Sequence, residues 1–245
     1  GRGAHLVELG SGASIKIRTL LNALPDLAQY TAIDISRDFL LQSAATLAED
    51  YPDLDVAAIC ADYTTDFEVP APTGLISSRT VAFFPGSTIG NFTPDEAKQF
   101  LKRLAAILGK GSGLLIGVDL KKDVPVLRAA YNDAKGVTAA FNMNLLSRIN
   151  AELGGDFDLG SFYHDAVYVE DLGRIEMRLI SQKSQSVTIG DETFAFGKNE
   201  HIHTESSHKF SLDQFRGICE IAGFTPVASW TDSKSLFSVH YLTAE

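Results

Sequence analysis

Short, continuous apolar runs alternate with segments of helical spacing through the first half of the chain. The first run, 6–9, stops at Gly10-Ser11-Gly12, and a helical pattern opens at about residue 14. The same alternation predicts further strands near 30–35, 54–60, 81–84 and 113–119, with helices near 15–24, 36–47 and 93–108. Ser36 is expected to cap the second helix, and Thr93 with Glu96 to form a capping box at the start of the third. Apolar strands that alternate with helices are typical of a parallel sheet covered on both faces. The first half is therefore predicted to be a doubly wound α/β sheet.

The alternation breaks after residue 119. Residues 121–208 predict two helices (about 123–134 and 138–153) and a hairpin-like strand pair (about 174–188 and 192–197) around a Gly-Asp turn. A capping box at 211–214 then opens a helix that ends at Gly223, and strands near 225–231 and 236–243 form an antiparallel pair. We expect one Rossmann-like domain made of 1–120 and 209–245, and an inserted α+β lobe made of 121–208.

Several chemically useful residues follow the ends of predicted strands. Gly10 follows the first strand, Asp34 ends the second, Asp62 follows the third, and Gly86 follows the fourth. Right-handed crossovers place the carboxyl ends of parallel strands along one edge of the sheet, where ligands bind. These residues are therefore predicted to line one ligand crevice.

The glycine turn does not favour a dinucleotide. That motif has a third glycine where this chain has Ile15, and it needs one acid, whereas this chain has Asp34 and Asp62. Asp34 can accept hydrogen bonds from ribose hydroxyls, and Asp62 can accept one from an adenine amino group while Tyr63 packs on the ring. A ribose, an adenine and an amino-acid tail on the turn describe S-adenosylmethionine (SAM). The terminal antiparallel pair is also the usual ending of the class I methyltransferase fold.

Composition narrows the choice of partner. The formal net charge of −10 argues against nucleic acid, and no apolar run approaches the roughly 20 residues of a membrane-spanning helix. We interpret Cys60 and Cys219 as reduced core thiols of a cytoplasmic protein. Three histidines between 201 and 208 lack metal-ligand spacing, so we expect no metal site. The expected partner is a small molecule, and the expected state is a monomer.

Five motifs make the sequence more specific. They are 6–16 (LVELGSGASIK), 86–91 (GSTIGN), 131–142 (YNDAKGVTAAFN), 174–177 (RIEM) and 204–210 (TESSHKF). In this order they resemble the histidine Nα-methyltransferases of ergothioneine biosynthesis, and the resemblance runs from residue 5 to near the end. It implies an enzyme that moves three methyl groups from SAM to the α-amine of histidine, which gives hercynine.

The resemblance also implies roles for individual residues. The cofactor would be held by Gly10, Ser11, Gly12, Lys16, Asp34, Asp62, Tyr63 and Gly86. Asn91 and Tyr131 would bind the carboxylate and amine end of the amino acid and act as the catalytic pair, with Gly86 also bordering the substrate. Met177, Glu205 and Ser207 would line the imidazole pocket, the last two by hydrogen bonds to the ring.

Other interpretations stay open. Relatives in this family methylate other aromatic amino acids such as tryptophan, and fused forms allow a SAM-binding domain without activity of its own. Asn91 also fits a turn residue, and Tyr131 and Met177 also fit packing positions. The family normally has several dozen residues before the first strand that contribute tyrosines to the substrate pocket, and this chain begins almost at that strand. We therefore expect either a fragment or a chain from which an N-terminal part was removed, whose cofactor site survives and whose histidine binding is weakened or lost.

Overall fold

The computed structural model describes residues 3–12, 15–24, 26–72 and 79–245. It divides the chain into two compact units. The first unit is Gly1–Leu120 with Phe210–Glu245, and the second unit is Lys121–Lys209. The expected helix start near residue 14 and part of the loop after Tyr63 lie outside the described residues.

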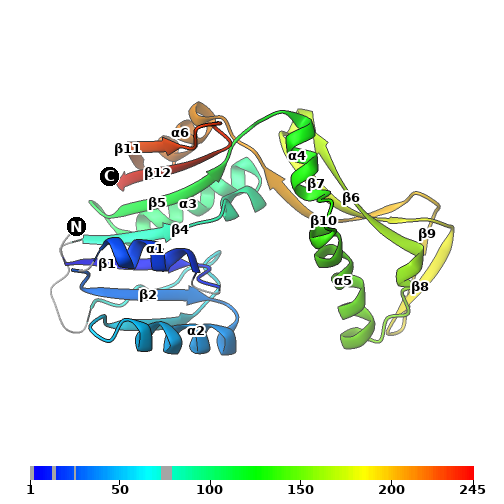
Figure 1. Cartoon of the computed structure of the whole chain (residues 1–245), viewed down its shortest axis with the longest axis horizontal. Coiled ribbons are helices and arrows are strands. Elements are labelled where there is room, and N and C mark those ends of the chain that lie inside the picture. The colour runs from blue at the N-terminus through cyan, green and yellow to red at the C-terminus, as the bar shows by residue number, and fades with distance from the viewer. Residues whose placement is uncertain (1–2, 13–14, 25, 73–78) are drawn as a thin grey trace. The chain divides into compact units, whose positions relative to one another are not determined.

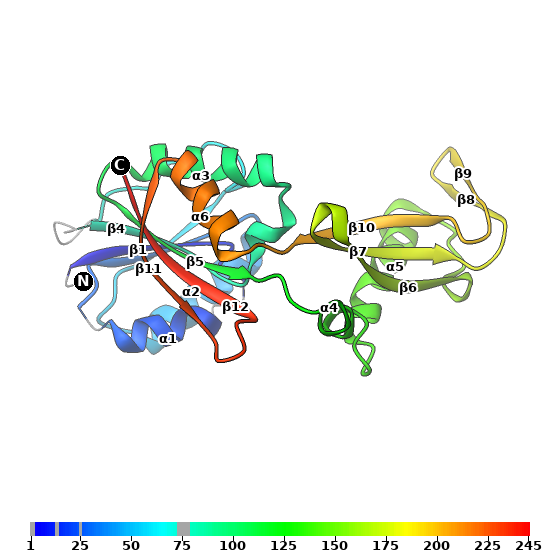
Figure 2. The same cartoon turned by 90° about the horizontal axis from the view of Figure 1, so that it is seen from above.

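The first unit is a mostly parallel sheet (Figures 1 and 2). Among its described residues, seven strands run in the order β11-β12-β5-β4-β1-β2-β3. The four pairings from β5 to β3 are parallel, while β12 is antiparallel to both of its neighbours. The strands are β1 (Ala4–Leu9), β2 (Gln29–Asp34), β3 (Val56–Cys60), β4 (Arg79–Phe84), β5 (Gly113–Asp119), β11 (Phe224–Thr231) and β12 (Phe237–Ala244). The predicted class I α/β fold with its antiparallel ending is confirmed.

Helices cover both faces of this sheet (Figure 2). On one face, α1 (Ile15–Ala23) and α2 (Arg37–Asp50) bury their apolar side chains, while α3 (Pro94–Leu108) and α6 (Leu212–Ile221) do so on the other. Successive residues of β1 serve the two faces, because Leu6 packs with α1 and α2 whereas Val7 packs with α3 and α6. This double burial explains why the strands read as continuous apolar runs.

Two predicted helix starts turn out differently. Thr93 and Glu96 form the predicted capping box at the start of α3, with both reciprocal hydrogen bonds present. Ser36 occupies the N-cap position of α2, but its side chain makes no capping hydrogen bond, so that expectation is wrong. Its amide instead donates to Oδ1 of Asp34 at 2.9 Å, which turns the chain sharply at the end of β2.

The second unit is an α+β lobe (Figure 1). Three antiparallel strands run in the order β10-β7-β6, with a separate β8-β9 hairpin, in this fully described part of the chain. The strands are β6 (Phe162–Val169), β7 (Arg174–Ser181), β8 (Gln185–Ile189), β9 (Glu192–Phe196) and β10 (His201–His208), and the helices are α4 (Val124–Tyr131) and α5 (Val137–Leu153). Both helices contact β6 and β7.

The predicted strand pair of this lobe is partly wrong. The single strand expected near 174–188 is two strands, of which β7 is central between β6 and β10 and only β8 pairs with β9. Ile175, Met177 and Leu179 alternate as predicted and are buried, with Ile175 packed against Leu127 of α4 and Leu179 against Leu146 of α5. The turn at Gly190 is confirmed, with a φ of 58° at that glycine.

The two cysteines differ in exposure. Cys219 is buried as expected, but Cys60 at the end of β3 is exposed, so the core assignment of Cys60 is wrong. Strand β3 is the edge strand of its sheet, which leaves alternate residues uncovered.

Among the described residues, no helix is long and apolar enough to cross a membrane.

Candidate functional site

The glycine turn joins β1 to the segment before α1. Gly10 and Gly12 have φ angles of 68° and 49°, a left-handed backbone that costs other residues strain. The amides of Gly10 and Ser11 both donate to the carbonyl of Ile33, at 2.8 and 3.2 Å, so the turn is tied to the neighbouring strand β2. The turn therefore presents a fixed backbone at the carboxyl edge of the sheet.

Asp34 holds the same turn from the end of β2. Its Oδ2 accepts from the amide of Gly12 at 3.2 Å, while its Oδ1 accepts from the amide of Ser36 at 2.9 Å. Each carboxylate oxygen can accept more than one hydrogen bond, so both oxygens keep capacity for a ligand. The structure thus joins two of the predicted cofactor residues, Gly12 and Asp34, in one hydrogen-bonded element.

Tyr63 and Asp62 bring a ring and a carboxylate to this edge. A Cβ on Gly10 would lie 3.4 Å from the Tyr63 ring, and the ring itself packs edge-on against Phe84 with centroids 5.5 Å apart. Burial and the charges of Asp34 and Asp62 raise the pKa of Tyr63, which keeps its hydroxyl neutral. Hydrogen bonds from the Thr64 hydroxyl and amide to Oδ1 lower the pKa of Asp62, which keeps it a carboxylate.

Gly86 lies under the side chain of Lys16. A Cβ at Gly86 would come within 2.6 Å of Lys16 Nζ, and the φ of Gly86 is 76°. Gly86 follows β4 and Lys16 lies in the first turn of α1, so the structure brings these two predicted residues together. Glycine is the residue that leaves room for the ammonium here.

Sequence reasoning missed Glu8 next to this turn. Glu8 is buried on β1, and its Oε2 accepts from the Tyr30 hydroxyl at 2.6 Å. Burial raises the pKa of Glu8 to about 7, against the lowering effects of the Tyr30 hydrogen bond and the Lys16 charge. An acidic residue inside an otherwise apolar run is the sequence signal that could have identified it.

The residues of this edge fit the groups of SAM. Ser11 Oγ is buried and has no hydrogen-bond partner within the described part of the chain, which is unusual for a buried hydroxyl. An orphaned hydroxyl on a glycine turn suits a polar ligand tail, the Asp34 carboxylate suits a pair of ribose hydroxyls, and the Tyr63 ring with Asp62 suits an adenine. Lys16, predicted beside them, would favour the ligand's carboxylate.

Asn91 ends the short helix η1 (Thr88–Asn91), which follows β4 in the first unit. Its side chain is exposed, and no hydrogen bond to its amide occurs among the described residues. The capping box starts two residues later at Thr93. The substrate-binding and catalytic roles of Asn91 stay predictions.

In the second unit, Tyr131 and Ser207 meet across two elements. The Tyr131 hydroxyl at the end of α4 lies 2.8 Å from Oγ of Ser207 on β10. Sequence reasoning missed a third member, Lys209, whose Nζ lies 2.9 Å from the Tyr131 hydroxyl and 2.7 Å from Ser207 Oγ. Lys209 is only 3% exposed, which is rare for a lysine. The signal was the alternation of residues 205, 207 and 209, which a prediction of β10 would have aligned on one face.

Glu205 and Met177 form the other part of this cluster. They face each other in the register of β10 and β7, and Met177 is buried while Glu205 is half-buried. Burial raises the pKa of Glu205, and the positive charge of Lys209 opposes that rise. Four of the predicted substrate residues, Tyr131, Met177, Glu205 and Ser207, therefore lie in one cluster around Lys209.

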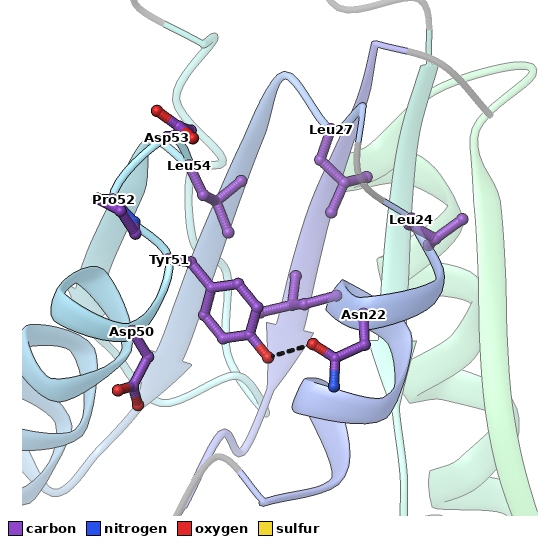
Figure 3. A pocket seen from close by; sticks show the side chains of 9 residues that line it. Asn22, Leu24, Leu27, Asp50, Tyr51, Pro52, Asp53 and Leu54 are labelled. Carbon is purple, nitrogen blue, oxygen red and sulfur yellow. Dashed lines mark hydrogen bonds between the residues drawn. The ribbon is translucent and has the colours of Figure 1, made fainter.

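A separate pocket lies at the opposite edge of the sheet (Figure 3). It has a volume of about 360 Å³ and is formed by the end of α1 and the segments that precede β2 and β3. The Tyr51 hydroxyl donates to Oδ1 of Asn22 at 2.8 Å beside it, and Asp50 pairs with Arg18. It contains none of the predicted site residues.

Comparison with known proteins agrees with this geometry. The family described as histidine-specific, SAM-dependent methyltransferases matches residues 2–244. The histidine N-alpha-methyltransferase of Mycolicibacterium smegmatis is 39% identical over 96% of this chain and 73% of its own length. Ergothioneine biosynthesis protein 1 of Neurospora crassa is 30% identical over 94% of this chain and 26% of its own length. The CcbJ methyltransferase of Streptomyces caelestis shares the fold, with a TM-score of 0.55 at 11% identity, covering 100% of this chain and 89% of that one.

Proposed function

The chain belongs to the histidine-specific, SAM-dependent methyltransferase family, and from that premise we propose that it methylates the α-amine of L-histidine three times. The product is Nα,Nα,Nα-trimethylhistidine (hercynine), an intermediate of ergothioneine biosynthesis. The observation that carries this proposal is the pairing of Glu205 and Ser207 two residues apart on β10, beside Met177. A carboxylate and a hydroxyl match the two ring nitrogens of a neutral imidazole, of which one donates and one accepts.

The residues of the first unit hold the methyl donor. When bound, SAM supplies a methyl group attached to a positively charged sulfur, and that sulfur is a good leaving group when an amine lone pair attacks the methyl carbon. The turn at Gly10–Gly12 and the Ser11 hydroxyl receive the amino-acid tail, Asp34 orients the ribose, and Asp62 with Tyr63 fixes the adenine. Holding the donor in one orientation lowers the barrier, because alignment of the reacting atoms is the main demand of a displacement.

The residues that bind the amino acid must present a neutral amine. The α-ammonium loses one proton before each of the three transfers, and each transfer then forms a nitrogen–carbon bond as the bond between the methyl carbon and sulfur breaks, so the trimethylated nitrogen carries no proton. The exposed Asn91 amide can donate an N–H to the carboxylate and accept from an amine N–H through its oxygen, which orients the amine and leaves its lone pair free. The Tyr131 oxygen can accept from an amine N–H. We assign the catalytic role to this positioning, with water as the proton acceptor.

The proposal includes the setting of the reaction. We infer a cytoplasmic, monomeric enzyme whose partner is a small amino acid, with neither nucleic acid nor a membrane involved. The net charge of −10 supports this, because phosphate surfaces repel an acidic protein. The reduced thiols of Cys60 and Cys219 support a reducing compartment.

Tryptophan is the competing substrate. An indole has one N–H and no second ring nitrogen. Its N–H could donate to the Glu205 carboxylate, but the Ser207 hydroxyl would have no ring nitrogen to donate to. A buried polar group left unpaired weakens binding strongly. Histidine is therefore the better match.

The variant Glu205→Ala tests the proposed substrate site. We expect it to raise the KM for histidine by about 10-fold or more, since a charged hydrogen bond is lost, while the Kd for SAM stays within about twofold. The control is Glu192→Ala, which removes an exposed carboxylate from β9 of the same unit. Equal weakening of histidine and SAM binding in Glu205→Ala would contradict the assignment of Glu205 to the imidazole.

A further inference from the structure

The Lys209 ammonium closes a triangle with two hydroxyls. Its Nζ lies 2.7 Å from Ser207 Oγ and 2.9 Å from the Tyr131 hydroxyl, and the two hydroxyl oxygens are 2.8 Å apart. The ammonium also lies 4.8 Å from the centre of the Tyr131 ring. Lys209 and Ser207 are 3% and 6% exposed, so water competes little for these hydrogen bonds.

The chemistry of an ammonium fixes the direction of these bonds. It has three N–H donors and no acceptor, so both hydroxyl oxygens must accept from Lys209. The two hydroxyls hold two hydrogens between them, and the Tyr131 hydroxyl donates one to Ser207 Oγ. Ser207 then accepts twice, from Lys209 and from Tyr131, and both of its acceptor positions are filled. Its own hydrogen is left to point away from the triangle.

Glu205, two residues before Ser207, provides a hydrogen-bond acceptor next to this donor. Residues 205, 207 and 209 lie on the same face of β10 and its extension. The regular pairing of β10 with β7 is interrupted by a bulge between 203 and 205, just before Glu205. The Glu205 carboxylate accepts hydrogen bonds, whereas Ser207 is restricted to donating one. Together they make an acceptor and a donor with fixed roles.

We propose that Lys209 is a positioning residue that restricts Ser207 to donating, so that Glu205 and Ser207 select one tautomer of a neutral imidazole. The ring nitrogen that carries hydrogen faces Glu205, and the bare nitrogen faces Ser207. Without Lys209, the Ser207 hydroxyl can rotate and accept, and the pair no longer distinguishes a bare ring nitrogen from an N–H or C–H. This inference rests on the proposed histidine substrate.

A double-mutant cycle between Lys209→Met and Ser207→Ala tests the proposal. Each single variant is expected to raise the histidine KM by about 10-fold with kcat changed by less than about threefold, because a substrate hydrogen bond is weakened in both. The histidine KM of the double variant is expected to stay within about twofold of the higher KM of the two single variants, since Lys209 acts through Ser207. Independent effects that multiply in the double variant overturn the proposal.

Matched variants separate this role from a structural one. Lys209→Arg keeps a donor-only cation and should recover part of the histidine KM, whereas Lys183→Met removes an exposed lysine of the same unit and should change nothing. The Kd for SAM should stay within about twofold in every variant, and a parallel loss of SAM and histidine binding overturns the proposal. If Lys209→Met does not fold, Lys209→Gln replaces it in the double-mutant cycle with Ser207→Ala, and effects on the histidine KM that multiply again overturn the proposal.

The outcomes also separate this inference from the proposed function. An unmodified protein that does not methylate histidine defeats the proposed function. A protein that methylates histidine with an unchanged KM in Lys209→Met defeats only the role of Lys209.

Discussion

The amide nitrogen of Gly12 lies 3.2 Å from Oδ2 of Asp34, which ties the glycine turn after β1 to the end of β2. The same carboxylate accepts from Ser36 at the start of α2. One side chain therefore shapes the turn that we propose receives the tail of SAM, and it is itself the proposed acceptor for the ribose.

Asp34→Asn is expected to weaken SAM binding by about 10- to 100-fold, because a charged acceptor is lost from both the turn and the ribose. Calorimetric titration with SAM measures the change. Asp38→Asn, a fully exposed carboxylate in the first turn of α2, is the control and should bind SAM as the unmodified protein does. Equal Kd values for Asp34→Asn and the control would contradict the assignment of Asp34.

The Tyr63 ring, rather than its hydroxyl, is expected to bind the adenine. Tyr63→Phe should change the Kd for SAM by less than about threefold, since the ring stays against Gly10 and Phe84. Tyr63→Ala should weaken SAM binding by roughly 10- to 100-fold through loss of stacking. The same titration decides, with thermal unfolding to confirm folding. A large loss in Tyr63→Phe would instead give the hydroxyl the main role.

Gly86→Ala is expected to weaken SAM binding by displacing Lys16. The added Cβ would lie 2.6 Å from Lys16 Nζ, and the left-handed φ adds about 1–3 kcal/mol of strain. Because Nζ ends a flexible, exposed side chain that can move aside, denaturant unfolding should show similar losses for Gly86→Ala and for the control Gly154→Ala, whose φ is 65° and whose added Cβ meets no described atom within 4 Å. Calorimetric titration should show a raised Kd for SAM in Gly86→Ala alone. An unchanged Kd in Gly86→Ala would contradict the placement of Lys16 beside the cofactor.

Glu8 is expected to make the first unit less stable as pH rises. Its pKa is raised from 4.5 to about 7 by burial, so between these pH values the folded chain binds more protons than the unfolded chain. The free energy of unfolding should therefore fall by about 3 kcal/mol from pH 4.5 to above pH 7, relative to Glu8→Gln. Denaturant unfolding at pH 5 and pH 8 measures the difference, with the exposed Glu49→Gln as control. Parallel pH profiles for the unmodified protein and Glu8→Gln would refute the raised pKa.

The fold of the first unit was predictable because its determinants are local. The capping box at Thr93 and Glu96, the glycine turn and the apolar runs each specify a structure within a few residues, and each is present as predicted. The parallel direction of β1 to β5 followed from the alternation of strands with helices. Ser36 was the exception, since Asp34 two residues earlier competes for the same turn.

The second unit was harder to predict because some of its strands have no regular apolar pattern and depend on pairing with a neighbouring strand. β6 and β10 mix polar and apolar residues, and they became strands by pairing with the central β7. Lys209 was missed for the same reason. A lysine beside a strand normally lies in solvent, whereas here the buried ammonium donates to the Tyr131 hydroxyl from α4 and to the Ser207 hydroxyl.

The most direct test of the central claim is the mass of the product formed from histidine and SAM by the full-length protein. Incubation with histidine, and separately with tryptophan, is followed by mass spectrometry of the amino acid. The account predicts that histidine gains three methyl groups and that tryptophan gains none. Unchanged histidine in the presence of bound SAM, or methylation of tryptophan instead, would contradict it.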